Sequence, residues 1–277
     1  MTPYEKYQEV KKIYLNNGLK VIPLKEKIPV LDNWLENCTN DCSEVANWLG
    51  QCPELNFGLP CQPNNLFVLD IDAKKGQHGL ESWKNLLNDL GLQEPETLVQ
   101  KTANGGLHFI FLSDDDLKKL ASTVSAFEKY PDIDIRNQSQ IVVYPSEVNG
   151  KKYEFLNHNP IKQMPLKLKK FLMKNIKTIR QENLERKKFY ENINSDNYLP
   201  DIVFPKGQRD VNLFSFINDL YYFKKLDYDE IMELAHKFNE KCLEEPFSDK
   251  TVEYKVNKAF CKFRPIKIII GTKGVDK

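Results

Sequence analysis

The chain has 277 residues, of which 41% are hydrophobic and 29% are charged, and its formal net charge is +1. The length suits one large domain, or one medium and one small domain, and the composition supports a real core. The charge excludes a strongly basic chain, although a carboxylate-rich site can offset a basic groove elsewhere. No stretch approaches the ~20 apolar residues of a membrane span, and the charged N-terminus has no apolar signal segment. We therefore expect a cytoplasmic protein with no membrane partner.

Helices and strands alternate in the predicted structure of the first 160 residues. Apolar residues at helical spacing predict helices at 3–16 and 79–90, and residues 43–50 form a short predicted helix. The acidic and polar residues 113–119 are expected to form another short helix. Ser43 is the expected N-cap of the second helix. Apolar and β-branched runs bounded by turns predict strands at 19–24, 56–60, 66–72, 97–102, 107–112, 132–136 and 140–146. Asn149-Gly150 predicts a hairpin turn within residues 147–156.

The cysteines of the same region invite a zinc interpretation. Four of the six cysteines lie within the first 61 residues, and Cys38 and Cys42 are separated by three residues. Structural zinc sites usually present paired C-x2-C knuckles, and the sequence has none. We therefore expect reduced thiols and no zinc.

The character of the chain changes after about residue 165. The segment 166–193 is long, charged and free of glycine and proline, which predicts a linking helix. Three helical stretches follow, at 210–224, 227–241 and 248–262, and they predict a small bundle. We therefore expect an α+β domain over 1–170, a linking helix or linker over 171–200, a helical module over 201–265 and a tail over 266–277.

Two carboxylates end the predicted strand 66–72. Successive side chains of a strand alternate between faces, so Asp70 and Asp72 share a face. Such neighbours repel each other unless a cation or a proton lies between them. Oxygen-only ligands suit Mg²⁺ or Mn²⁺, and two such ions can hold an attacking hydroxyl and a triphosphate in line. A D-x-D pair alone also fits a solvated strand end, a glycosyltransferase or a phosphohydrolase.

A glycine turn lies between the next two predicted strands. Thr102 ends the first strand, Gly105 and Gly106 allow a tight turn with close backbone approach, and His108 opens the second strand. A histidine placed there can donate a hydrogen bond to a phosphate oxygen. The alternative is an ordinary hairpin whose histidine is only a polar residue on one face.

The strand 132–136 supplies a third set of charges. Asp132, Asp134 and Arg136 alternate with apolar residues and therefore share one face. One aspartate would complete a metal site, and Arg136 would face a triphosphate. The alternative is an exposed edge strand with alternating charge.

The order of these three elements resembles the prim-pol branch of the archaeo-eukaryotic primase superfamily. Members carry a D-x-D or D-x-E motif, a small-x-His motif and a third acid on a later strand. The matching residues here are Asp70 and Asp72, Gly106-Leu107-His108, and Asp134. The segments "NFGLP" (56–60) and "YPSEVNGKKYEF" (144–155) also resemble family segments. The resemblance covers about residues 15–160.

The resemblance implies an RRM-like primase-polymerase fold. It also implies an enzyme that synthesises DNA primers de novo and extends them on single-stranded DNA. It implies that Asp70, Asp72 and Asp134 hold two divalent cations, Mg²⁺ or Mn²⁺, for nucleotidyl transfer. The residues expected to contact the nucleotide are His108, Arg136, Thr102, Lys101, Gly106 and Ser146. Its substrates would be dNTPs or NTPs, and the sequence leaves that choice open.

The C-terminal region has a resemblance of its own. The start of this region resembles the start of the primase C-terminal helical module. The matching residues are Gly207, Arg209, Asn212, Leu213 and Phe214. The resemblance implies that this module helps to start chains. Arg209 and the aromatic-basic run "YYFKK" (221–225) would contact the initiating nucleotide or the template. The alternative is an ordinary three-helix domain.

Two features of related proteins have no counterpart in the sequence. Some relatives carry a zinc-binding insertion, which has no counterpart here, and many continue into a helicase. The sequence has no G-x-x-x-x-G-K-[ST] phosphate loop, so a helicase or other replication partner would be separate, or the chain is part of something longer. Two other functions also fit the sequence. One is a non-catalytic adaptor that binds single-stranded DNA, and the other is a D-x-D glycosyltransferase. The sequence leaves open whether the protein acts in plasmid replication, in phage replication or with a CRISPR system.

Overall fold

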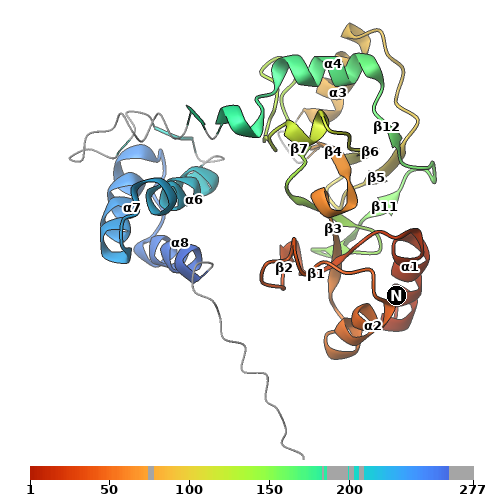
Figure 1. The fold of residues 1–277 in the computed structure, drawn as a ribbon, viewed down its shortest axis with the longest axis horizontal. Coiled ribbons are helices and arrows are strands. Elements are labelled where there is room, and N and C mark those ends of the chain that lie inside the picture. The colour runs from red at the N-terminus through yellow and green to blue at the C-terminus, as the bar shows by residue number, and fades with distance from the viewer. Residues whose placement is uncertain (74–77, 183, 186–198, 200–202, 206–208, 262–277) are drawn as a thin grey trace, which may run out of the picture. The chain divides into compact units, whose positions relative to one another are not determined.

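The chain forms two compact units, Met1–Glu182 and Asn183–Lys277. The computed structural model describes residues 1–73, 78–182, 184–185, 199, 203–205 and 209–261 (Figure 1). Each unit has its own hydrophobic core. The predicted mixture of helices and strands in the first part of the chain is confirmed.

A six-stranded sheet forms the centre of the first unit. Its strands are β4 (Leu66–Ile71), β5 (Leu98–Lys101), β6 (Leu107–Leu112), β7 (Ile133–Arg136), β11 (Glu154–Phe155) and β12 (Lys162–Gln163). They lie in the order β11-β5-β6-β4-β7, with β12 beside the far end of β6. The β12–β6 pair is parallel and the other pairs are antiparallel. The strand β4 is therefore flanked on both sides and central.

A second, smaller sheet and a hairpin complete the strands. The second sheet has the order β2 (Ile28–Pro29), β1 (Ile22–Lys25), β3 (Asn56–Pro60) and β8 (Gln140–Val143). The hairpin pairs β9 (Glu147–Val148) with β10 (Lys151–Lys152). Asn149 and Gly150 both have positive φ angles at its turn, as the Asn-Gly pair predicted.

Among the helices of the first unit are α1 (Pro3–Ile13), α2 (Cys42–Gln51), α3 (Gly79–Asp89) and α4 (Leu166–Asn175), with 3₁₀ turns η1 (Leu15–Asn17), η2 (Gln62–Asn64) and η3 (Leu117–Lys119). The prediction of Ser43 as an N-cap was wrong. Asp41 caps α2, because its Oδ1 accepts from the backbone N–H groups of Ser43 at 2.7 Å and Glu44 at 2.9 Å. A carboxylate at this position also interacts favourably with the positive end of the helix dipole.

Alternation along β4 separates two cores. Phe67, Leu69 and Ile71 pack with side chains of α3 and α4 on one face of the central sheet. Leu66 and Val68 face the other way, toward α1, α2 and the second sheet. Figure 1 shows α3 and α4 on one side of these strands and α1 and α2 on the other. All five side chains are essentially inaccessible, and each contributes roughly 1.5–3 kcal/mol through burial.

The predicted linking helix is interrupted. The helix α4 ends at Asn175, and Ile176 is extended, with φ −108° and ψ 134°. The next residues pair with another segment instead, because the N–H of Ala121 donates to the carbonyl of Lys177 at 3.1 Å. Tertiary pairing therefore overrides the helical propensity of the sequence. Residues 183, 186–198 and 200 of the predicted link lie outside the described residues.

The described part of the second unit contains α6 (Arg209–Asp219), the π turn η4 (Leu220–Lys224), α7 (Tyr228–Cys242) and α8 (Asp249–Cys261). Their shared core includes Phe216 and Phe238, whose stacked rings lie 4.4 Å apart between centroids. Gly207 and the predicted tail 266–277 lie outside the described residues. Across the described parts of the chain, no helix is both long enough and apolar enough to span a bilayer.

Candidate active site

The register of the central sheet brings the three sequence motifs together. Asp70 on β4 pairs with His108 on β6 on one side and with Asp134 on β7 on the other. Gln100 on β5 pairs with His108 from the opposite side. Directly opposed residues of antiparallel strands project to the same face. Gln100, His108, Asp70 and Asp134 therefore form one line across four strands, which we call the polar row.

The polar row lies where an apolar sheet face ends. Leu66 and Val68 precede Asp70 on the same face of β4, and both are in the core against the second sheet. Gly106 lets the turn before β6 pass close to the end of β4, since a Cβ there would lie 2.3 Å from the carbonyl oxygen of Ile71. No larger residue fits this contact without moving the backbone. The close approach sets the position of His108, two residues later.

Arg136 joins the two carboxylates of the row. Its Nη2 lies 2.6 Å from Oδ2 of Asp134 and 3.2 Å from Oδ2 of Asp70, and its Nε also lies 3.2 Å from the latter atom. Nε2 of His108 lies 3.4 Å from Oδ1 of Asp70. Asp70 thus has a cationic or hydrogen-bonding neighbour at each carboxylate oxygen.

The two carboxyl groups have opposite pKa shifts. Burial raises the pKa of Asp70, but His108 and Arg136 outweigh burial and lower that pKa to about 2. Burial also raises the pKa of Asp134, and here Arg136 and the backbone N–H of Ser125 do not compensate, so the pKa rises to about 6. The negative charges of Asp70 and Asp72 add to the rise. A buried carboxyl group near other carboxylates is the environment that a bound cation stabilises.

Asp72 lies immediately after β4 and borders the polar row. Its N–H donates to the carbonyl of Asp132 at 3.0 Å, and its own carbonyl accepts from the N–H of Gly79 at 3.1 Å. Burial is the largest cause of the raised pKa values of Asp134 and Tyr153, and the charge of Asp72 adds to both. Asp72 therefore acts electrostatically on the same space as the row.

Asp132 has a local structural task. Its backbone is left-handed, with φ 62°, and its Oδ2 accepts from the N–H of His78 at 2.8 Å. It holds the start of α3 against β7. Of the two aspartates at 132 and 134, Asp134 is therefore the one in register with Asp70.

The carboxylates fit the ligand chemistry of a hard divalent cation. Asp70, Asp72 and Asp134 supply only oxygen donors, which Mg²⁺ and Mn²⁺ prefer. In the described residues, no three His, Cys, Asp or Glu side chains are already gathered as a metal site. The guanidinium of Arg136 instead lies between Asp70 and Asp134.

Besides Arg136, which bonds to the carboxylates of the row, and Gly106, which positions the turn before His108, four sequence-predicted nucleotide contacts lie outside the polar row. Lys101 is exposed, and strand alternation puts it on the face of β5 opposite to Gln100. Thr102 is half-buried at the glycine turn, where its N–H donates to the carbonyl of Gly106 at 2.8 Å. The other two are Ser146 and Arg209.

Ser146 is fully buried, and its hydroxyl group is already hydrogen-bonded within the protein. Its Oγ accepts from the N–H of Phe57 at 2.9 Å and lies 3.2 Å from the carbonyl oxygen of the same residue. Ser146 thus holds β3 to the segment after β8, and it offers no accessible group to a nucleotide. The interpretation of Ser146 as a nucleotide contact is not supported by this placement.

Arg209 belongs to the second unit and is engaged there. Its Nη1 donates to the carbonyl of Glu245 at 2.7 Å, and its guanidinium carbon lies 4.4 Å from the ring centroid of Phe247. These contacts hold the start of α6 against the segment before α8. Arg209 therefore contributes to the packing of its own unit.

The sequence did not indicate one member of the polar row, Gln100, or two neighbours of the row, Tyr153 and Ser125. Gln100 contacts His108, Tyr153 lies near it with ring centroids 6.1 Å apart, and the N–H of Ser125 donates to Oδ1 of Asp134 at 2.7 Å. Counting the hairpin register outward from the glycine turn would have identified Gln100. Ser125 acts through its backbone in an irregular segment, so its side chain carries no signal.

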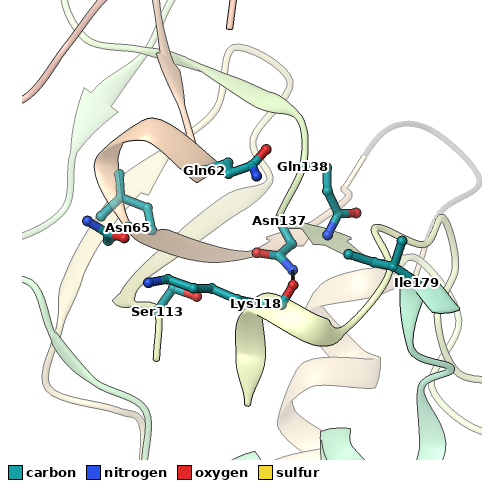
Figure 2. Close-up of a pocket in the computed structure, with 8 residues that line it drawn as sticks. Gln62, Asn65, Ser113, Lys118, Asn137, Gln138 and Ile179 are labelled. Carbon is teal, nitrogen blue, oxygen red and sulfur yellow. Dashed lines mark hydrogen bonds between the residues drawn. The ribbon is translucent and has the colours of Figure 1, made fainter. Parts of the chain in front are cut away.

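A separate polar pocket lies at the other end of β4 (Figure 2). It is lined by Gln62, Asn65, Leu66, Ser113, Lys118, Asn137, Gln138 and Ile179. Leu66 precedes Asp70 by four residues, which is about 13 Å along a strand. The side-chain amide of Asn137 donates to the carbonyls of Leu117 and Leu120, so this pocket wall holds a turn in place. The pocket does not include the polar row.

Comparison with known proteins agrees with the geometry. The family model described as "Bifunctional DNA primase/polymerase, N-terminal" matches residues 11–167, which is more than half of the 277 residues. No curated protein matches the chain. The matched span lies within the first unit and contains the whole polar row. The chain therefore belongs to the Prim-Pol family.

Proposed function

We propose that the chain is a template-dependent primase-polymerase that joins nucleotides on single-stranded DNA, starting primers de novo and extending them. The observation that carries this proposal is the polar row, which brings Asp70, His108 and Asp134 together on adjacent strands within the family-matched span. Family membership supports nucleotidyl transfer with DNA and nucleotides as substrates. It also argues against a D-x-D glycosyltransferase.

The carboxylates are assigned to cation binding. Prim-Pol enzymes generally use divalent metals, and Asp70, Asp72 and Asp134 would hold two of them, Mg²⁺ or Mn²⁺. Bound cations of this kind lower the pKa of an attacking hydroxyl and neutralise charge on a triphosphate. The raised pKa of Asp134 supports this assignment, because a nearby cation would favour its ionised form.

Arg136 and His108 are assigned to the phosphates. The guanidinium presents several N–H donors in a planar fork, which suits phosphate oxygens, and it already lies beside the carboxylates. His108 offers a ring nitrogen at 3.4 Å from Asp70, so a phosphate bound near the carboxylates would lie within its reach. Neither residue needs to move a proton in this assignment. Both hold and orient the nucleotide.

The second unit is assigned to chain initiation. Joining two free nucleotides lacks the affinity that an existing duplex supplies, so an extra contact to the template would lower the cost of the first step. Tyr222 and Phe223 in the run 221–225 are exposed aromatic residues, and aromatic stacking beside lysines suits single strands. Arg209, by contrast, is engaged with Glu245 and Phe247. Unwinding of a duplex would require a separate helicase or other replication partner.

The decisive experiment is a paired assay on one single-stranded template. Extension of an annealed primer and synthesis without a primer are measured with dNTPs, NTPs and mixtures, in Mg²⁺, in Mn²⁺ and in a chelator. We expect both activities with a divalent cation and neither in the chelator or in Asp70→Asn. The exposed Asp116, replaced in Asp116→Asn, is the control and should remain active. Template binding without incorporation under every condition would favour the non-catalytic adaptor.

Truncation tests the initiation role. A chain ending at Glu182 retains the first unit, including the pairing of Ala121 with Lys177. We expect it to extend an annealed primer and to lose most unprimed synthesis. Equal loss of both activities would contradict a separate initiation module.

A further inference from the structure

A fully buried glutamine stands at one end of the polar row. The side chain of Gln100 is 0% exposed, and its hydrogen bonds are all internal. Its Nε2 donates to the carbonyl of Val142 at 2.9 Å and lies 3.0 Å from Nδ1 of His108. Its Oε1 accepts from the N–H of Tyr144 at 2.8 Å. Gln100 therefore connects His108 to the end of β8 in the second sheet.

Two backbone groups determine which way the amide of Gln100 points. The carbonyl of Val142 can only accept a hydrogen bond, and the N–H of Tyr144 can only donate one. Reversing the amide would oppose two oxygens on one side and two N–H groups on the other. The nitrogen of Gln100 is thus the atom that faces His108.

The orientation of the amide determines where the proton of His108 lies. An amide nitrogen donates and does not accept, so Nδ1 of His108 must be the acceptor of this contact. In a neutral imidazole, one ring nitrogen accepts and the other carries the hydrogen. The hydrogen therefore lies on Nε2, the atom that faces Asp70.

We propose that Gln100 is a positioning residue that fixes the ring of His108 in its Nε2–H tautomer, so that an N–H donor faces the nucleotide-binding side of the polar row. Phosphate oxygens only accept, so the opposite tautomer would place a ring lone pair against them. The same partner also fixes the ring plane, because both hydrogens of the Gln100 amide are used. The part of this proposal that concerns phosphate rests on the proposed function, whereas the tautomer does not.

Nitrogen NMR of the full chain tests the tautomer directly. The chain has four histidines, at 78, 108, 158 and 236, so His108 is assigned by the signals lost in His108→Ala. With ¹⁵N-labelled histidine, at a pH where the His108 signals are those of the neutral ring, we expect a protonated Nε2 and an unprotonated Nδ1. A protonated Nδ1, or a mixture of tautomers, in the wild-type chain overturns the proposal whether or not the chain polymerises.

One substitution isolates the donor atom. Gln100→Glu keeps an oxygen for the N–H of Tyr144 and replaces the nitrogen that faces His108, so we expect the Nε2–H preference to be lost. Asn56→Asp is the matched control. Asn56 also has a buried side-chain amide, but its hydrogen bonds go only to backbone groups of Glu26 and Glu147. The control should leave the tautomer of His108 unchanged, and an equal change in both variants would contradict a specific role of Gln100.

Kinetics separate positioning from general stability. We expect Gln100→Glu to slow nucleotide incorporation roughly 10- to 100-fold, as loss of an orienting partner of a site histidine does. In a His108→Ala background the same change should have little further effect, because the ring that it orients is gone. An undiminished effect in that background would show that Gln100 acts without His108. A wild-type chain with the expected tautomer and no incorporation would instead contradict the proposed function and leave the tautomer assignment standing.

Discussion

The start and the end of β4 present opposite environments on the same face of the sheet. Leu66 and Val68 are 1% and 0% exposed among apolar neighbours, whereas Asp70, two residues later, lies between His108, Asp134 and Arg136. Burial of the apolar end stabilises the fold. Burial of charge at the other end destabilises it unless each charge has a partner. The apolar start of β4 therefore supports the fold, whereas the charged end is kept for the proposed function.

The largest expected effect is loss of activity at the charged end. Replacing Asp70 and Asp72 together with alanine should reduce primer extension and unprimed synthesis by more than about 10³-fold, because the proposed cation ligands are removed. Incorporation is measured on a primed and an unprimed template, and circular dichroism verifies the fold. Undiminished polymerisation by a folded double variant would end the assignment of these carboxylates.

The apolar end should show the reverse profile. Leu66→Ala removes a buried side chain from the core and should lower the free energy of unfolding by about 2–5 kcal/mol. Incorporation per folded molecule should change little at a temperature where the variant is folded. Denaturant unfolding measures the free energy of unfolding. If Leu66→Ala lost as much activity as the Asp70 and Asp72 variant but kept its stability, the proposed difference between the two ends of β4 would be contradicted.

His108 tests whether the charged end grips phosphate. His108→Ala should slow incorporation by roughly 10²-fold, the effect of losing one positioned donor. The affinity for template DNA, measured by fluorescence anisotropy without nucleotide, should stay nearly unchanged. Equal losses of nucleotide use and DNA affinity would assign His108 to the template instead.

The smallest expected effects are those of Asp134 and Asp70 on the free energy of unfolding. The two residues are expected to act with opposite signs. The folded-state pKa of Asp134 is about 6, above its unfolded value, so its contribution to stability falls as the pH rises from about 4 to 6. Asp134→Asn should therefore be more stable than the wild type at pH 7.5 without divalent cations, by about 1–3 kcal/mol. The difference should disappear near pH 4.

Asp70 sharpens this test. Its folded-state pKa is about 2, below its unfolded value, so its stabilising contribution is present above about pH 4 and is lost as the pH falls toward 2. Asp70→Asn should therefore be less stable than the wild type at pH 7.5. Denaturant melts of both variants across this pH range measure the two signs. Stabilisation by both substitutions would mean that the pair Asp70–Arg136 contributes nothing.

Much of the site could be predicted because its signals are local. The apolar run before Asp70 indicated that Asp70 lies at the end of a buried strand, and the glycines at 105 and 106 indicated a tight turn before His108. Asn149-Gly150 likewise forms the predicted hairpin turn. These features depend on the backbone preferences of a few consecutive residues. The order of the motifs along the chain was enough to indicate the family.

Side chains that depend on distant segments were predicted less well. Lys101 and Gln100 are neighbours in sequence, yet only Gln100 faces the row, because the β5–β6 register decides the face. The sequence predicts Ser146 as a nucleotide contact, but its side chain bonds to Phe57, 89 residues away. Ile176 interrupts a sequence with helical propensity because the next residues pair with the segment around Ala121.

By itself, the sequence determined the alternation of the strands, the turns, and the kinds of charge that the site contains. These properties follow from local sterics and from the period of two along a strand. The family resemblance had already indicated Asp134 as the third acid, but only the tertiary structure decided that Asp134 lies in register with Asp70, that Arg136 bridges the two carboxylates, and that Gln100 holds His108. The reason is that strand register and buried hydrogen bonds are set by packing between segments far apart in the chain, where each polar group must find a partner once water is excluded.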